Sequence, residues 1–101
     1  MSRTPEAKVK ARVRLILDGL RANGVPLYYF FPAANGYGRA GIPDVIVCIR
    51  GCFVAIECKA GKNTLTPLQE RERTAILNAE GGWYLVDELS VEYLRAALEG
   101  M

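Results

Sequence analysis

Two apolar runs rich in β-branched residues, separated by only two residues, constrain the fold of this 101-residue chain more than any other feature. The runs are residues 44–49 and 52–57, and the residues between them are Arg50 and Gly51. Runs of this length and composition form strands, and a two-residue connection containing glycine favours a tight antiparallel turn. The sequence therefore predicts a β-hairpin in the middle of the chain.

The register of this hairpin predicts where its charged side chains lie. If Ile49 faces Cys52 across the turn, Asp44 lies directly opposite Glu57, with the two Cβ atoms about 5 Å apart on one face. Side chains alternate along a strand, so Lys59 emerges on the same face as Glu57. A slip of one residue would place the two acids on opposite faces. The predicted register brings two acids and a lysine to one end of the hairpin.

Two like charges that face each other destabilise a sheet unless a cation or a proton lies between them. Hard divalent ions such as Mg²⁺ prefer carboxylate oxygens together with water and substrate phosphate. Strand ends also carry solvated ion pairs, which contribute little to stability. Asp44, Glu57 and Lys59 therefore indicate either a metal site with a base beside it or an exposed, solvated hairpin end.

Three motifs around the hairpin carry a family resemblance. They are Gly-Ile-Pro-Asp at 41–44, Glu-Cys-Lys at 57–59 and Leu-Thr-Pro-Leu-Gln at 65–69. Together they resemble the virus-type replication-repair nuclease (VRR-NUC) family of the PD-(D/E)XK nuclease superfamily, over roughly residues 5–95. The resemblance implies a restriction-endonuclease-like core with its active site at the end of a central hairpin, and DNA cleavage that leaves a 5′-phosphate.

The resemblance also implies roles for individual residues. Asp44, Glu57 and the backbone carbonyl of Cys58 would bind Mg²⁺ or Mn²⁺, which polarises a phosphodiester and lowers the pKa of bound water. Lys59 would hold or help to deprotonate that water and would meet the developing negative charge. The chain contains no histidine, so catalysis would rest on carboxylates, lysine and metal-bound water.

Glu6 and Gln69 complete the implied catalytic set, and each has a second explanation. Glu6 precedes Val9 by three residues, at the inward-facing end of the first helix, where an acid also complements the helix dipole. Gln69 stands at the capping-box position after Thr66 and can bond back to the backbone there. The resemblance adds that Glu6 would complete or support the metal site, and that Gln69 would orient water or phosphate.

The net charge of +2 hides an asymmetry along the chain. Residues 1–62 carry ten lysines and arginines against four acids, whereas residues 63–101 carry three against seven. A basic region can contact the phosphate backbone of DNA, although a basic helix face is often only solvated. The first helix carries five such cations, and the predicted DNA contacts are Lys8, Arg12, Asn35, Tyr37, Arg39 and Lys62.

The segment 33–41 spaces its three glycines as in the dinucleotide-binding fingerprint. That fingerprint functions only where the loop opens a helix, whereas this segment leads into Pro43 and a strand. We therefore predict no nucleotide cofactor. Asn35, Tyr37 and Arg39 in this segment could contact a DNA backbone or stack on a base, or the segment could be a plain connecting loop.

Capping residues and apolar spacing predict the remaining elements. The expected elements are a helix capped by Thr4 that runs from Pro5 to about Asn23, a buried strand at Leu27–Phe31, a helix from Pro67 to about Ala79 or Glu80, a strand at Trp83–Val86, and a helix capped by Ser90 that ends near Glu99. The order αβββαβα over residues 1–101 predicts a single domain of the α/β class, with helices on a mixed sheet in an α+β arrangement.

The three cysteines, Cys48, Cys52 and Cys58, lie in apolar strand runs and lack the spacing of a zinc site, so we expect reduced core residues. No run approaches 18 apolar residues and no signal segment is visible, so we expect no membrane association. The expected location is the cytoplasm, and the family resemblance implies the cytoplasm of a bacterial or phage-infected host cell.

A homodimer is also expected. A chain of this length buries only about two-thirds of its unfolded surface as a single domain. Stand-alone members of the family are similar to Holliday-junction resolvases, which act as dimers. The candidate dimer surfaces are Tyr28–Phe31 and the apolar side of the last helix (Tyr93, Leu94, Leu98), although a place in the core is the commoner role for such segments.

The function predicted from the sequence is a metal-dependent, structure-specific DNA endonuclease, similar to a Holliday-junction resolvase or a repair nuclease of phage type. One alternative is a catalytically inactive DNA-binding or architectural module, which the presence of Asp44, Glu57 and Lys59 argues against. Another is a restriction-type endonuclease, for which the chain has little material beyond the core to build base-reading loops.

Overall fold

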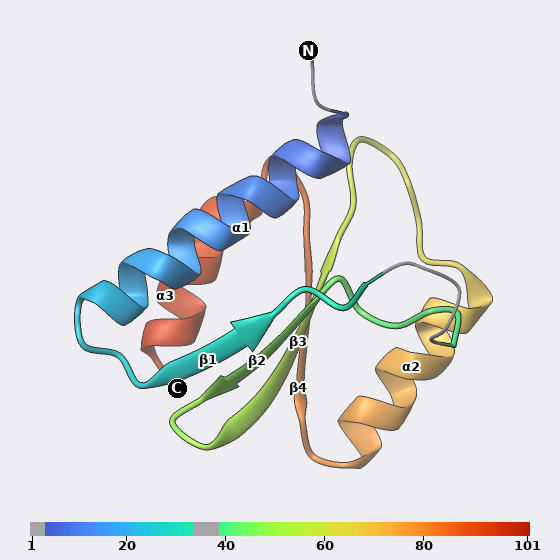
Figure 1. Cartoon of the computed structure of the whole chain (residues 1–101). Coiled ribbons are helices and arrows are strands. Elements are labelled where there is room, and N and C mark those ends of the chain that lie inside the picture. Colours follow the sequence, from blue (N-terminus) through green and yellow to red (C-terminus); the bar gives the residue numbers. More distant parts are fainter. Residues whose placement is uncertain (1–3, 34–38) are drawn as a thin grey trace.

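The fold combines a four-stranded sheet with three helices, as a computed structural model of residues 4–33 and 39–101 shows (Figure 1). This observation confirms the predicted class and the predicted order of elements, except that a short 3₁₀ turn precedes the last helix. In chain order the elements are α1 (Pro5–Ala22), β1 (Leu27–Phe30), β2 (Val45–Ile49), β3 (Cys52–Cys58), α2 (Pro67–Asn78), β4 (Gly82–Val86), η1 (Val91–Tyr93) and α3 (Leu94–Glu99).

The sheet has the order β1-β2-β3-β4, with the first three strands antiparallel and β4 parallel to β3. The hairpin between β2 and β3 has the predicted register, because Ile49 pairs with Cys52. Arg50 and Gly51 both have positive φ angles, 49° and 81°, as a two-residue hairpin turn of the primed type requires. The two strands therefore end side by side at the edge where the predicted acids lie.

Both long helices begin at the predicted capping residues. The Ala7 backbone N–H donates to Oγ1 of Thr4 at 3.1 Å, and Pro5 occupies the first turn. Thr66 and Gln69 form the complete capping box of α2. These caps satisfy backbone groups that would otherwise lack partners at the helix starts.

The predicted cap of the last helix is wrong. The side chain of Ser90 caps no helix, and its Oγ accepts from the backbone N–H of Asp87. Oδ1 of Asp87 accepts in turn from the N–H groups of Leu89 and Ser90. This local turn competes with helix formation, so the α-helix begins only at Leu94.

The hydrophobic core lies between one face of the sheet and the helices α1 and α3, which lie together in Figure 1. Alternate residues of β2 and β3 face these helices. Leu94 and Leu98 of α3 belong to this core, while Tyr93 just before them is 76% exposed. The fully buried large side chains are Val13, Ile16, Leu17, Leu20, Val45, Val47, Ile49, Val54, Ile56, Cys58 and Leu98.

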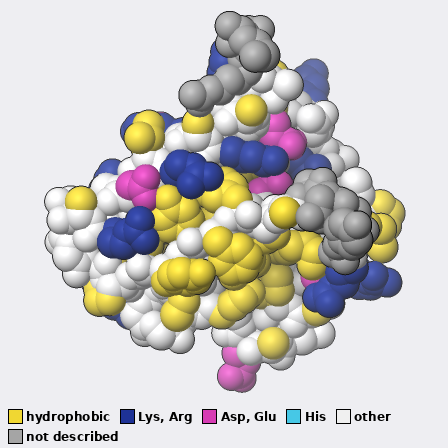
Figure 2. All heavy atoms as spheres, in the orientation of Figure 1, with side chains coloured by type: hydrophobic (Ala, Val, Ile, Leu, Met, Phe, Trp, Pro, Cys, Tyr) yellow, Lys and Arg dark blue, Asp and Glu magenta, His cyan; other side chains and the backbone are white. Residues whose placement is uncertain are grey.

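The opposite face of the sheet is covered only in part, which overturns two predictions. Tyr28 and Phe30 are 66% and 46% exposed, so β1 is half-buried rather than fully buried. Cys48 pairs with Tyr28 on this same face and is exposed, as is Cys52 beside the turn; only Cys58 is a core cysteine. The reason is that α2 packs mainly on β4. Figure 2 shows the resulting hydrophobic surface over the sheet, between α1 and α2.

Within the described part of the chain, no helix combines the length and the apolar character needed to cross a membrane.

Candidate active site

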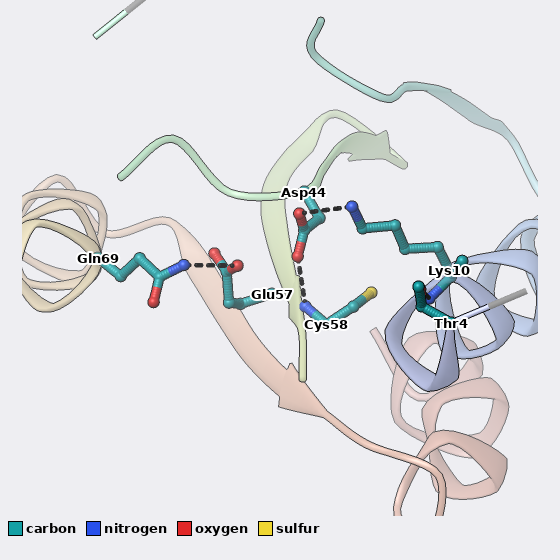
Figure 3. A network of polar contacts seen from close by, with 7 residues as sticks. Thr4, Lys10, Asp44, Glu57, Cys58 and Gln69 are labelled. Carbon is teal, nitrogen blue, oxygen red and sulfur yellow. Dashed lines mark hydrogen bonds and ion pairs between the residues drawn. The ribbon is translucent and has the colours of Figure 1, made fainter. Parts of the chain in front are cut away.

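Asp44 and Glu57 meet at the open end of the hairpin, as Figure 3 shows. Asp44 precedes Val45 and Glu57 follows Ile56, and because Val45 pairs with Ile56 the register continues to the two acids. Oδ2 of Asp44 accepts a hydrogen bond of 2.7 Å from the backbone N–H of Cys58. Glu57 is 2% exposed. The structure thus brings the two predicted acids together, and it places one of them almost entirely out of contact with solvent.

Gln69 connects this site to α2. Its Nε2 atom donates to Oε1 of Glu57 at 3.2 Å, while its Oε1 atom accepts from the backbone N–H of Thr66 at 2.9 Å. One side chain therefore caps the helix, as predicted, and also contacts the carboxylate, whereas the role of Gln69 in orienting water or phosphate stays a prediction. The capping box fixes the position from which Gln69 reaches Glu57.

Gly41 allows the segment before Asp44 to pass against the first turn of α2. Its φ angle is +87°, and a Cβ atom at this position would lie 2.5 Å from the carbonyl oxygen of Leu68 and 3.0 Å from the backbone nitrogen of Gln69. Only glycine accepts both the backbone conformation and this close approach. The glycine of the Gly-Ile-Pro-Asp motif therefore holds Asp44 and Gln69 in one place.

Lys10 also belongs to the site, although it was not among the predicted site residues. Its Nζ atom lies 3.3 Å from Oδ1 of Asp44. Partial burial opposes the charged form of Lys10, but the charge and hydrogen bond of Asp44, together with the charge of Glu6, raise its pKa. The signal in the sequence was its spacing, because Lys10 follows Glu6 by one helical turn and so lies above it on the same side of α1.

Lys59 and Glu6 lie at the margins of the acid pair. The backbone N–H of Lys59 donates to the carbonyl of Val86 at 2.9 Å, so the pairing with β4 extends one residue past β3. The charges of both side chains act on Glu57: Lys59 lowers its pKa and Glu6 raises it. Both predicted residues are therefore near Glu57, one as a compensating cation and the other as a further negative charge.

The acid pair suits a hard divalent cation. Burial, followed by the hydrogen bond and charge of Asp44, raises the pKa of Glu57 to about 9, because two carboxylates share a site with little solvent. Within residues 4–33 and 39–101, no three His, Cys, Asp or Glu side chains converge closely enough to hold one ion. The donor set is thus two carboxylates plus backbone, which is typical of Mg²⁺ sites that also use water and phosphate. Glu6 is not placed as a third ligand.

Replacing Glu57 by glutamine should stabilise the metal-free protein in a pH-dependent manner. Because the pKa of Glu57 rises on folding, from 4.5 to about 9, the folded state binds an extra proton between these values, and its stability falls as pH rises. In EDTA at pH 8, we expect Glu57→Gln to raise the free energy of unfolding by on the order of 2 kcal/mol. The difference should vanish near pH 4.5.

Urea unfolding at several pH values measures this effect. The matched control is Glu99→Gln, which removes an exposed acid from the end of α3 and should leave the pH profile unchanged. Equal stabilities of the native protein and Glu57→Gln from pH 5 to pH 9 would contradict the prediction.

The predicted DNA contacts are distributed over several surfaces. Lys8 and Lys62 are exposed. Arg12 makes two hydrogen bonds of 2.7 Å to Glu92, and Arg39 makes two of 3.1 Å to Glu72. These two arginines therefore already have carboxylate partners, which the sequence did not reveal. The remaining predicted contacts, Asn35 and Tyr37, lie outside the described residues.

Comparison with known proteins identifies the fold. No protein-family model matches the chain, and no curated protein matches it in sequence. Among solved structures, the chain is similar to one described as a "VRR_NUC domain", with a TM-score of 0.65 and 22% sequence identity over 91% of this chain and 95% of that chain. The chain therefore has the fold of that domain, which is the fold expected from the motifs that resemble this family.

Proposed function

We propose that this protein is a metal-dependent nuclease that hydrolyses phosphodiester bonds in DNA. The observation that carries the proposal is the pairing of Asp44 with the buried Glu57 at the end of the hairpin. Burying a carboxylate beside another is costly unless a cation compensates for it. In a fold shared with a VRR_NUC domain, this arrangement supports metal-assisted phosphoryl chemistry.

Asp44, Glu57 and the backbone carbonyl of Cys58 are the proposed ligands of Mg²⁺ or Mn²⁺. When bound, such an ion supplies Lewis-acid polarisation of the phosphate and acidifies water. The chain itself orients both acids, because the Cys58 N–H holds Asp44 and the Gln69 amide holds Glu57. Lys59 is proposed to bind the attacking water and to oppose the negative charge that develops on the phosphate.

The finer assignment rests on the family resemblance. We propose a structure-specific endonuclease of the Holliday-junction-resolvase or repair type, acting on branched or otherwise structured DNA in a cytoplasm. A homodimer is part of this proposal, and the exposed aromatic side chains of Tyr28 and Phe30 are one surface that it could use. Glu6 is proposed to support the site from α1 rather than to complete the metal ligands.

The test is cleavage of labelled DNA by the purified protein. Four-way junction, flap, nicked and linear duplex substrates are each incubated with Mg²⁺, Mn²⁺ or EDTA, in parallel with the Asp44→Ala variant. Cutting that requires metal and is lost in Asp44→Ala would support the nuclease, and the preferred substrate would identify its class. Tight binding without cutting under every metal would favour an inactive DNA-binding module. Discrete bands from long duplex would favour a restriction-type enzyme.

Replacing Lys59 by alanine should reduce cleavage by about 100-fold or more, since positioned proton transfer contributes about 10²–10⁴-fold in enzymes. The melting temperature should change little, because Lys59 lies beyond the last residue of β3. Arg71→Ala removes a cation from an exposed position on α2 and serves as the control. Single-turnover cleavage at saturating protein measures the effect, and an unchanged rate for Lys59→Ala would remove Lys59 from the mechanism.

A further inference from the structure

The cations of α1 lie on two separate flanks of the helix. At 3.6 residues per turn, Lys10, Arg14 and Arg21 point within about 40° of one another, and Lys8 and Arg12 form a second pair on the other flank. The ion pairs identify what each flank faces. Lys10 contacts Asp44 at the candidate site, whereas Arg12 contacts Glu92 beside α3. The flank that begins at the catalytic acids is therefore the one with Lys10 and Arg14.

This flank borders an open groove between α1 and the end of β1. The groove has a volume of about 570 Å³ and is lined by Ala7, Lys10, Ala11, Arg14, Leu15 and Phe31. We call it the α1–β1 groove. Ala7 and Ala11 keep the helix surface low beside the two cations, so an extended chain can approach the helix closely. Figure 2 shows lysine and arginine side chains in a row along this side of α1, next to the hydrophobic surface of the sheet.

Aromatic side chains of the β1 segment hold the arginines in place. The guanidinium carbon of Arg14 lies 4.3 Å from the ring centroid of Phe31, and that of Arg21 lies 5.3 Å from the ring of Tyr29. The Tyr29 hydroxyl donates to Asp18 at 2.6 Å, and Asp18 also pairs with Arg21. A stacked guanidinium keeps the N–H donors at its edge available, so it is positioned for a phosphate at little entropic cost.

Arg14 differs from the three cations of α1 that form ion pairs. Lys10, Arg12 and Arg21 each have a carboxylate partner. Of the residues that the structure describes, none offers a carboxylate within ion-pair distance of Arg14. Its charge is held over an aromatic ring, one helical turn from Lys10 and about 6 Å further along the helix axis. The groove therefore presents a fixed positive charge that forms no ion pair with a carboxylate of residues 4–33 or 39–101.

We propose that the α1–β1 groove binds the sugar–phosphate backbone of the substrate strand where this strand leaves the catalytic acids, with Lys10 and Arg14 contacting successive phosphates. The proposal rests on the nuclease function and specifies its DNA-binding surface. It assigns the α1 contacts to Lys10 and Arg14 in place of the predicted Lys8 and Arg12. A row of cations that starts at a phosphodiester-cleaving site and continues along a groove matches the charge of a DNA strand.

The test is the affinity for a fluorescent four-way junction and for the corresponding duplex, measured by anisotropy in EDTA from 50 to 300 mM KCl, so that no cleavage occurs. Arg14→Gln should weaken binding by about 5-fold at 100 mM salt, and should lower the slope of log affinity against log salt by about 0.9, the value for one lost phosphate contact. Lys10→Gln should act in the same direction. Arg50→Gln, at the opposite end of the hairpin, is the control for loss of one charge. Lys8→Gln removes one charge from the other flank of α1, so its affinity shows whether the flank matters.

Two results would overturn the proposal that the α1–β1 groove binds DNA. One is unchanged affinity and salt slope for Arg14→Gln. The other is a loss of affinity in Lys8→Gln and Arg50→Gln as large as that in Arg14→Gln. This result would indicate that DNA responds to the overall positive charge of the protein and not to a defined contact. Cleavage in Mg²⁺ or Mn²⁺ is assayed separately. If the protein cuts DNA but its affinity does not depend on Arg14, DNA binding in the α1–β1 groove is refuted and the nuclease function stands. If binding depends on Arg14 but no DNA is cut, binding in the groove is supported and the nuclease function is refuted.

Discussion

Replacing Asp44 by asparagine is expected to abolish metal-dependent DNA cleavage while the protein remains folded. Asparagine keeps an oxygen that can accept from the backbone N–H of Cys58, so the end of the hairpin should stay closed. It removes the negative charge that the proposed cation requires and that Lys10 now contacts. We expect the cleavage rate to fall by about 100-fold or more, as when a charge-stabilising group is removed from other active sites.

Cleavage of labelled DNA and thermal unfolding followed by circular dichroism give the two measurements. Glu99→Gln removes one exposed acid elsewhere and should leave both unchanged. Since Asp44→Asn relieves the repulsion between two adjacent carboxylates, its melting temperature in EDTA should equal or exceed that of the native protein. A pure Asp44→Asn protein that still cuts at the native rate would refute the proposed catalytic site.

Replacing Gly41 by alanine is expected to produce the largest loss of stability among these variants. A φ angle of +87° costs a non-glycine residue roughly 1–2 kcal/mol. The added Cβ atom would also lie 2.5 Å from the Leu68 carbonyl oxygen, so the segment and α2 would have to separate. We expect a total loss of at least about 3 kcal/mol, or a melting temperature lower by roughly 12–24 °C for a domain of this size.

Gly24→Ala provides the matched control. Gly24 also has a positive φ angle, +92°, but no atom lies within 4 Å of the position that its Cβ would take. This variant should therefore show the backbone cost alone, about 1–2 kcal/mol. The difference between the two variants isolates the close approach of the motif to α2. If Gly41→Ala were no less stable than Gly24→Ala, that approach would not be needed for the fold.

Much of the fold follows from patterns that act within a few residues. The apolar, β-branched runs at 44–49 and 52–57 predict the hairpin, and the two-residue turn fixes its register. Thr4 and Thr66 predict two helix starts because a cap and its partner lie three residues apart. Asp44 and Glu57 could be brought together for the same reason, since the register of one hairpin places both side chains. The prediction failed at Ser90, where Asp87 offered the backbone a competing turn.

The parts of the site that depend on packing could not be predicted in this way. The ion pair of Lys10 with Asp44 depends on how α1 lies across the sheet. The pairs Arg12–Glu92 and Arg39–Glu72 join residues 80 and 33 positions apart, and no local period relates them. These contacts arise only when separate elements dock.

The exposure of one face of the sheet also depends on how separate elements dock. An apolar strand such as Leu27–Phe30 is compatible with one covered face or with two, and the outcome depends on where α2 comes to rest. Alternation along a strand assigns side chains to faces, which is a property of the backbone, but it does not say what covers each face. The hairpin, its register and its two acids are therefore contained in the order of the residues, whereas the choice of Lys10 as neighbour, the close approach at Gly41 and the open face beside the site come from the docking of helices onto the sheet.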